Sequence, residues 1–165
     1  MKKVAVIGYG GQGAWHCSQI LKSDVTVLAG VYDLKEERRQ AAQDNGIYVY
    51  ESNEAIFADK TVDIIVVATP NDVHEDLVVN GLMSGHNVIC EKPVALSVAE
   101  FDRMVEASKE SGEKLSVHQN RRWDVDYLAM KAIKESGKIG KVFNIESRIH
   151  GSRGIPSDWR CEKEH

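Results

Sequence analysis

The sequence contains no apolar run that approaches the ~20 residues a helix needs to cross a lipid bilayer. Its start, Met1-Lys2-Lys3, leads directly into the apolar stretch Val4–Ile7, without the longer apolar segment and small-residue cleavage site of a signal peptide. These two absences argue against a membrane protein and against a secreted one. We therefore predict a cytoplasmic location and no membrane partner.

Cysteine and basic charge are also scarce. The three cysteines, Cys17, Cys90 and Cys161, lie far apart and form no C-x-x-C pair, which indicates reduced thiols rather than disulfides or a metal site. The net charge is -4 and no long basic block occurs, which argues against nucleic acid as a partner. With 42% hydrophobic and 28% charged residues, the 165-residue chain has the composition of a folded globular protein.

Short apolar runs alternate with amphipathic stretches up to about Asn120. The runs are almost continuously apolar, as expected for parallel strands that are covered on both faces. Strand-helix-strand alternation of this kind predicts an α/β fold with a doubly wound parallel sheet over residues 1–120. The predicted strands are Val4–Ile7, Val25–Val31, Ile64–Ala68, Val88–Cys90 and Leu115–His118.

One of the intervening helices carries clear signals at both ends. Apolar residues recur at helical spacing from Val98 through Phe101. Ser97 and Glu100 have the spacing of a capping box at the start of this helix. Gly112 is placed to end it.

Residues 121–165 follow a different pattern. Apolar residues from Val125 to Ile133 form a helical stripe that Gly137 closes, and we interpret it as a linking helix. Apolar and polar residues then alternate over Val142–His150, which predicts a strand with one buried and one solvent-exposed face. We interpret it as the first strand of an incomplete antiparallel α+β domain. An unpaired strand with an apolar face tends to pair with a strand of another chain. We therefore expect a homo-oligomer, or a disordered tail beyond about Lys138.

A glycine-rich turn follows the first predicted strand and opens a helix. Its glycines permit a tight turn, a close approach to a pyrophosphate and close helix packing, and the helix start offers N–H groups to the anion. Asp33 ends the next strand, about 20 residues on, where a carboxylate can bond ribose hydroxyls and would repel a 2′-phosphate. The pattern predicts a dinucleotide-binding (Rossmann) fold that takes NAD, with NADP kept as an alternative by Lys35, Arg38 and Arg39. The turn residues are Gly8, Gly10, Gly11, Gln12 and Gly13.

Three further segments carry a family resemblance. Ala68-Thr69-Pro70-Asn71 follows one predicted strand, with His74 one turn into a helix; Glu91-Lys92-Pro93 follows the next; Asp158-Trp159-Arg160 lies near the end. Together with the glycine turn and His16, these segments resemble the Gfo/Idh/MocA oxidoreductases, the family of glucose-fructose oxidoreductase and inositol dehydrogenase. The first two segments lie at carboxyl ends of strands, where open α/β sheets bind their ligands.

The resemblance implies a role for each matching residue. Lys92 is the expected catalytic residue, because a lysine at this position can bond a substrate hydroxyl or a developing oxyanion, and its bond to Pro93 is expected to be cis. A solvated surface lysine and a helix-capping Asn71 are the plain alternatives. His16 and His118 are interpreted as packing residues. The residues expected at the cofactor are Ala68, Thr69, Pro70, Asn71, His74, Glu91, Lys92, Asn120, Trp159 and Arg160.

The sequence departs from the family near its end. Members continue into a large α/β domain that supplies an aspartate and a catalytic histidine, and their motif does not occur before His165. We expect the chain to be truncated before that histidine and to hold mainly the cofactor-binding half of an NAD(P)-dependent oxidoreductase of sugars, cyclitols or polyols. The alternatives are a non-catalytic dinucleotide-binding module or inactive fragment, and a methyltransferase, which leaves Glu91-Lys92-Pro93 unexplained.

Overall fold

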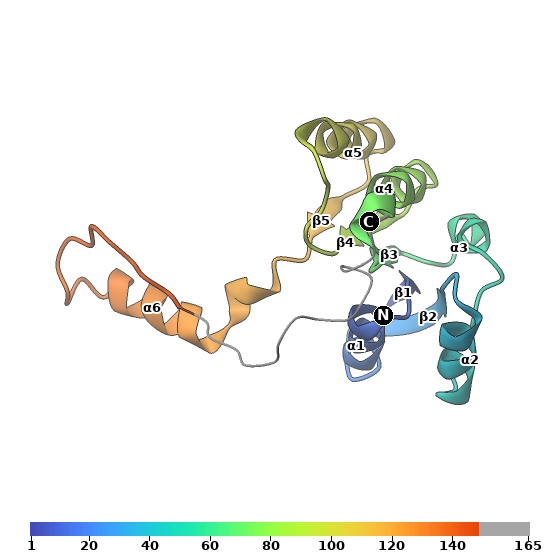
Figure 1. Cartoon of the computed structure of the whole chain (residues 1–165), viewed down its shortest axis with the longest axis horizontal. Coiled ribbons are helices and arrows are strands. Elements are labelled where there is room, and N and C mark those ends of the chain that lie inside the picture. The colour runs from blue at the N-terminus through green and yellow to red at the C-terminus, as the bar shows by residue number, and fades with distance from the viewer. Residues whose placement is uncertain (149–165) are drawn as a thin grey trace. The chain divides into compact units, whose positions relative to one another are not determined.

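The computed structural model describes residues 1–148 of the chain (Figure 1). The chain divides into two compact units, Met1–His118 and Gln119–His165, and the first of them holds the sheet. Within residues 1–148, no helix combines the length and the apolar content that a membrane span requires.

The first unit is built on a five-stranded parallel sheet with the strand order β2-β1-β3-β4-β5. The chain runs from β1 outward to β2 and then returns to β3 on the other side of β1. The predicted doubly wound α/β fold is therefore confirmed. In such sheets, ligands bind at the carboxyl ends of the strands where the order reverses, which lies between β1 and β3. The strands span Lys2–Ile7 (β1), Thr26–Tyr32 (β2), Ile64–Val67 (β3), Asn87–Cys90 (β4) and Leu115–Val117 (β5).

Helices cover both faces of this sheet (Figure 1). On β1, Ala5 and Ile7 belong to one buried apolar cluster, whereas Val4 and Val6 belong to the other. Alternate residues of a strand point to opposite faces, so burial of both sets explains why the strands are almost continuously apolar. The first cluster includes residues of α3 (Asn53–Ala58), α4 (His74–Met83) and α5 (Val98–Ser111), and the second includes residues of α1 (Gly11–Ile20) and α2 (Glu36–Asp44).

Both ends of α5 follow from its sequence, with one difference. The Ser97 hydroxyl accepts a hydrogen bond from the Glu100 N–H at 3.2 Å, and Gly112 ends the helix with a left-handed φ of +77°. The Glu100 carboxylate accepts from the Leu96 N–H at 2.8 Å, where a capping box would use the N–H of Ser97. The predicted cap is present, and its return bond is displaced by one residue.

The second unit begins with a short 3-10 helix, η2 (Asn120–Trp123), followed by α6 (Val125–Glu135). The helix predicted from the apolar stripe is confirmed. The strand predicted over 142–150 is wrong for the described residues 142–148, which form no regular structure. No strand pairs with this segment within residues 1–148, so its N–H and C=O groups lack the partners a strand requires. Residues 149 and 150 lie outside the described part of the chain.

Candidate functional site

The candidate site lies at the carboxyl edge of the sheet in the first unit. Each strand is followed directly by one residue of this site. Because all five strands are parallel, these residues share one edge. In chain order they are Gly8, Asp33, Ala68, Glu91 and His118.

The glycine turn packs tightly against its surroundings. Gly8 has a φ of +94°, and a Cβ on it would lie 2.5 Å from the carbonyl oxygen of Ala68. A Cβ on Gly13 would lie only 1.8 Å from the carbonyl oxygen of Gly8, whereas one on Gly11 would meet nothing within 4 Å in the described part of the chain. Helix α1 therefore starts directly on the turn, and its first N–H groups are available at the edge of the sheet, as at phosphate-binding helix starts.

Asp33 is held against this turn and is only 6% exposed. Its Oδ2 atom accepts a hydrogen bond from the Tyr9 N–H at 2.7 Å, and its Oδ1 accepts from the Lys35 N–H at 2.9 Å. The Arg38 guanidinium lies 3.2 Å from Oδ2, whereas Arg39 donates to the carbonyl oxygen of Asp33. Of the three basic residues considered for NADP, Arg38 is the one whose side chain faces the carboxylate.

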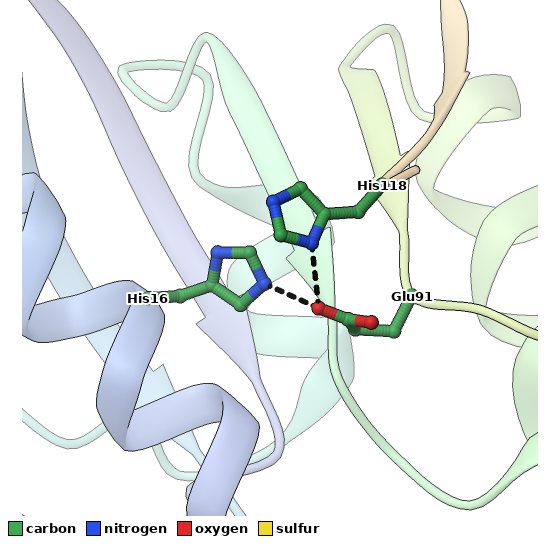
Figure 2. Close-up of side chains that lie close together, drawn as sticks. All are labelled: His16, Glu91 and His118. Carbon is green, nitrogen blue, oxygen red and sulfur yellow. Dashed lines mark hydrogen bonds and ion pairs between the residues drawn. The ribbon is translucent and has the colours of Figure 1, made fainter. Parts of the chain in front are cut away.

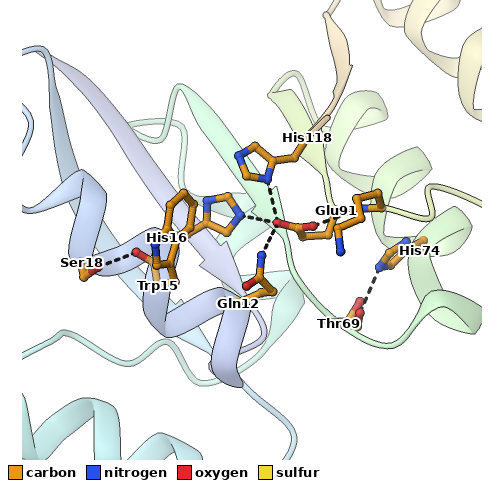
Figure 3. A network of polar contacts seen from close by, with 9 residues as sticks. Gln12, Trp15, His16, Ser18, Thr69, His74, Glu91 and His118 are labelled. Atoms are coloured by element: carbon orange, nitrogen blue, oxygen red, sulfur yellow. Dashed lines mark hydrogen bonds and ion pairs between the residues drawn. The ribbon is translucent and has the colours of Figure 1, made fainter. Parts of the chain in front are cut away.

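The loop after β3 is tied to the loop after β4 by one histidine. His74 is fully buried, and its Nε2 atom lies 3.0 Å from the Thr69 carbonyl oxygen (Figure 3). Its Nδ1 atom lies 3.1 Å from the carbonyl oxygen of Pro93. Thr69 Oγ1 is buried and has no hydrogen-bond partner within the described residues. Asn71 begins the 3-10 helix η1 (Asn71–Val73), and Val73 occupies the N-cap of α4. The plain alternative of Asn71 as the cap of α4 is therefore wrong.

Glu91 lies at the centre of the site and is only 4% exposed. Its Oε1 atom is 2.8 Å from His16 Nε2, 2.9 Å from His118 Nδ1 and 3.1 Å from Gln12 Nε2 (Figures 2 and 3). Its other oxygen, Oε2, accepts from the Lys92 N–H at 3.1 Å. Three elements thus converge on one carboxylate: α1, the end of β4 and the end of β5.

The hydrogen bonds at Glu91 decide its charge. Burial alone would raise the pKa of this carboxyl. The hydrogen bonds that it accepts, above all the one from His16, together with the charge of His118, outweigh burial and bring the pKa down to about 2. Glu91 is therefore an ionised carboxylate at neutral pH.

The two histidines at Glu91 are the residues whose place sequence reasoning missed. They were interpreted as packing residues, and they lie 75 and 27 positions from Glu91 in the sequence. The available signal was that His118 is the last residue of a predicted strand and that His16 lies in the helix opened by the glycine turn. Both rings also contact Trp15, with centroid separations of 5.2 Å and 5.8 Å.

Lys92 is exposed at the same edge, and the predicted cis bond between Lys92 and Pro93 is present. Within residues 1–148 its ammonium group has no hydrogen-bond or ion-pair partner, so Nζ is available to a ligand. Asn120 lies in η2 of the second unit. The predicted residues Trp159 and Arg160 lie outside the described part of the chain.

Comparisons with known proteins agree with this geometry. Residues 2–119 match the model of an oxidoreductase family, GFO_IDH_MocA, with an NAD-binding Rossmann fold. Myo-inositol 2-dehydrogenase of Thermotoga maritima is 32% identical over 150 residues, which cover 88% of this chain and 45% of that protein.

Solved structures show the same similarity. A NAD-binding protein from Listeria innocua is 41% identical, with a TM-score of 0.94 over 99% of this chain and 49% of that one. GenD2 from gentamicin A biosynthesis, in complex with NAD, is 28% identical, with a TM-score of 0.77 over 82% of this chain and 39% of that one. The chain therefore spans less than half the length of these proteins. It belongs to the Gfo/Idh/MocA oxidoreductase family, whose NAD-binding Rossmann domain it carries in residues 2–119.

Proposed function

We propose that the protein is an NAD-dependent oxidoreductase that acts on a hydroxyl group of a sugar, cyclitol or other polyol. The residues described form its cofactor-binding part. The observation that carries the proposal is the buried Asp33 carboxylate, fixed by the Tyr9 N–H beside the glycine turn. The substrate class follows from the inositol dehydrogenases among the relatives. The predicted cytoplasmic location and homo-oligomer remain predictions.

The residues of the carboxyl edge suit a dinucleotide. The N–H groups at the start of α1 would bind the pyrophosphate, and Asp33 would accept hydrogen bonds from the ribose hydroxyls. The Thr69 hydroxyl, which has no hydrogen-bond partner within residues 1–148, is a buried polar group that a ligand would satisfy. Closer to the nicotinamide, Glu91 would bond its ribose. In the proposal, Ala68, Pro70, Asn71, Asn120, Trp159 and Arg160 also line the cofactor, and His74 holds the Thr69 loop in place.

Lys92 is the proposed catalytic residue. Bound nicotinamide supplies the hydride chemistry. The Lys92 ammonium, which has no partner within residues 1–148, would donate a hydrogen bond from Nζ to the reacting oxygen of the substrate. A cation at this atom stabilises the negative charge that develops as the hydroxyl proton leaves. Such a lysine positions and polarises the substrate. To take up the hydroxyl proton, the ammonium would first have to pass one of its own protons to another group.

A dinucleotide-binding module without catalysis is the second candidate. It is favoured by the same observation on Lys92: within residues 1–148, no acid or base lies in hydrogen-bond contact with Nζ. Proton transfer in a dehydrogenase requires a group that passes the proton onward. The two candidates share a cofactor site and differ in turnover.

Titration with NADH and NADPH, followed by nicotinamide fluorescence, tests the cofactor site. We expect NADH to bind more tightly than NADPH, and Asp33→Ala to erase that preference because the repulsion of a 2′-phosphate is lost. Asp24→Ala is the matched control, since Asp24 is exposed and precedes β2 at the opposite edge of the sheet. A folded chain that binds neither dinucleotide would contradict the proposed site.

Hydride transfer with myo-inositol and a panel of polyols then separates the two candidates. Turnover that falls by about 10²–10⁴-fold in Lys92→Ala, in a variant that is still saturated with NADH, supports the oxidoreductase. Tight NADH binding with no turnover on any polyol supports the binding module. Turnover that is equal in wild type and Lys92→Ala would show that another group carries the chemistry.

A further inference from the structure

Two imidazoles and one carboxylate converge beside the glycine turn (Figure 2). We propose that His16, Glu91 and His118 form a binding site for a divalent transition-metal ion, with Zn²⁺ as the ion that this ligand set fits best. The proposal goes beyond the oxidoreductase function and does not depend on it, because it concerns binding of the ion and no step of hydride transfer.

The ligand atoms are close to the spacing that zinc imposes. His16 Nε2 and His118 Nδ1 lie 2.8 Å and 2.9 Å from Glu91 Oε1, and all three ligand atoms lie within 4.8 Å of one another. A tetrahedral Zn²⁺ ion with bonds of about 2.0–2.2 Å holds its ligand atoms roughly 3.3 Å apart. Entry of the ion therefore requires the two contacts to lengthen by about 0.5 Å. It also requires the two imidazole nitrogens, which lie within 4.8 Å of each other, to adopt the same spacing of roughly 3.3 Å, and rotation of the two histidine side chains supplies both changes.

The chemistry of the ligands selects the class of ion. Two histidines and one glutamate are the protein ligands of open zinc sites, and a set of two histidines and one carboxylate also suits other first-row ions. Calcium and magnesium prefer sites built from oxygen, so a pair of imidazoles argues against them. The His118 side chain is 23% exposed, which leaves one side of the cluster open to water as a further ligand.

The carboxylate is already oriented by groups that would not bind the ion. Its Oε2 atom accepts from the Lys92 N–H, and the Gln12 amide donates to Oε1. Outer contacts of this kind fix ligand orientation in known metal sites. His16 and Glu91 are 7% and 4% exposed, so neither ligand has to be immobilised when an ion binds.

The other histidines of residues 1–148 differ from this pair. His74 has both ring nitrogens at carbonyl oxygens, and so does His86, with Val62 and Phe57 as its partners. Neither ring has a nitrogen left for an ion. His16 and His118 instead direct a ring nitrogen at the same carboxylate oxygen. A hydrogen bond and a metal bond are alternatives at these nitrogens, because a ligating nitrogen carries no proton.

Isothermal titration of the metal-free full chain with Zn²⁺ tests the proposal. The key variants are His16→Gln and His118→Asn, whose amide nitrogens replace Nε2 and Nδ1 as hydrogen-bond donors but are poor zinc ligands. We expect wild type to bind one Zn²⁺ per chain and no Mg²⁺, and each variant to lose more than about 100-fold in Zn²⁺ affinity. The matched control is the double variant His150→Ala/His165→Ala, which should bind as wild type does.

Two results would overturn the proposal: a wild-type chain that does not bind Zn²⁺, or His16→Gln and His118→Asn variants that bind it as tightly as wild type.

A second measurement needs no change to a ligand. Trp15 contacts both imidazoles, so its fluorescence should be quenched as Co²⁺ fills the site, and the quenching should vanish in Trp15→Phe. Quenching that is undiminished in Trp15→Phe would place the ion elsewhere and would also overturn the proposal.

Discussion

Replacing Gly13 by alanine should force helix α1 away from the sheet. The added Cβ would lie 1.8 Å from the Gly8 carbonyl oxygen and 2.8 Å from its carbon, both of them backbone atoms. Carbon–oxygen contacts normally begin at about 3.3 Å, so the helix must move by roughly 1.5 Å. Overpacking typically costs 1–3 kcal/mol, and a clash of backbone on backbone belongs at the upper end, at about 3 kcal/mol.

The matched control is Gly11→Ala, two positions earlier in the same helix, where an added Cβ meets nothing within 4 Å of the described residues. This variant should be neutral or stabilised by up to about 1 kcal/mol, because it restricts the unfolded chain. Thermal unfolding followed by circular dichroism should give a melting temperature roughly 10 °C lower for Gly13→Ala and unchanged or higher for Gly11→Ala. Equal melting temperatures for the two variants would refute the close packing of α1 on the turn.

Four further changes have outcomes that follow from the structure. Ser97→Ala removes the N-cap of α5 and should lower the free energy of unfolding by about 1 kcal/mol in a urea titration. Arg38→Ala removes the cation beside the buried Asp33 carboxylate, so NADPH affinity should fall by about 10-fold while NADH affinity changes less. Burial raises the pKa of the Cys17 and Cys90 thiols from 9.0 to about 12. In a Cys161→Ser chain, a thiol reagent should therefore leave both unmodified until unfolding. Because these pKa values are raised in the folded chain, the unfolded chain loses the thiol protons at a lower pH than the folded chain does. The free energy of unfolding should therefore fall as pH rises from about 9 toward 12. The fall should be steeper in wild type than in Cys17→Ala.

The sheet was the easiest part of the fold to predict. Burial on both faces makes parallel strands nearly continuous in apolar residues, and the runs at Val4–Ile7 and Ile64–Ala68 show this directly. Strand order has no such local signal and depends on contacts between distant segments. The alternation over Val142–His150 shows the limit of pattern reasoning, because it describes the two faces of a strand and not its hydrogen-bond partner.

The candidate site was also predictable only in part. The glycine turn and Asp33 were predictable because their spacing along the chain reflects one strand-helix-strand unit. The cluster at Glu91 was not, because its members come from α1 and from the ends of β4 and β5. No periodicity relates His16 to His118, and only the parallel arrangement of the strands brings them together.

The glycines that lead into β4 and β5 have a practical consequence. Gly85 and Gly112 are exposed, have positive φ angles, and precede their strands at the edge opposite the candidate site. Exposed turns are where chains tolerate insertions best. A fluorescent tag, a protease site or a new pair of termini could be introduced there without touching the residues around Glu91. Circular permutants opened at these two turns would thus let the folding of the sheet be altered independently of its ligand-binding chemistry.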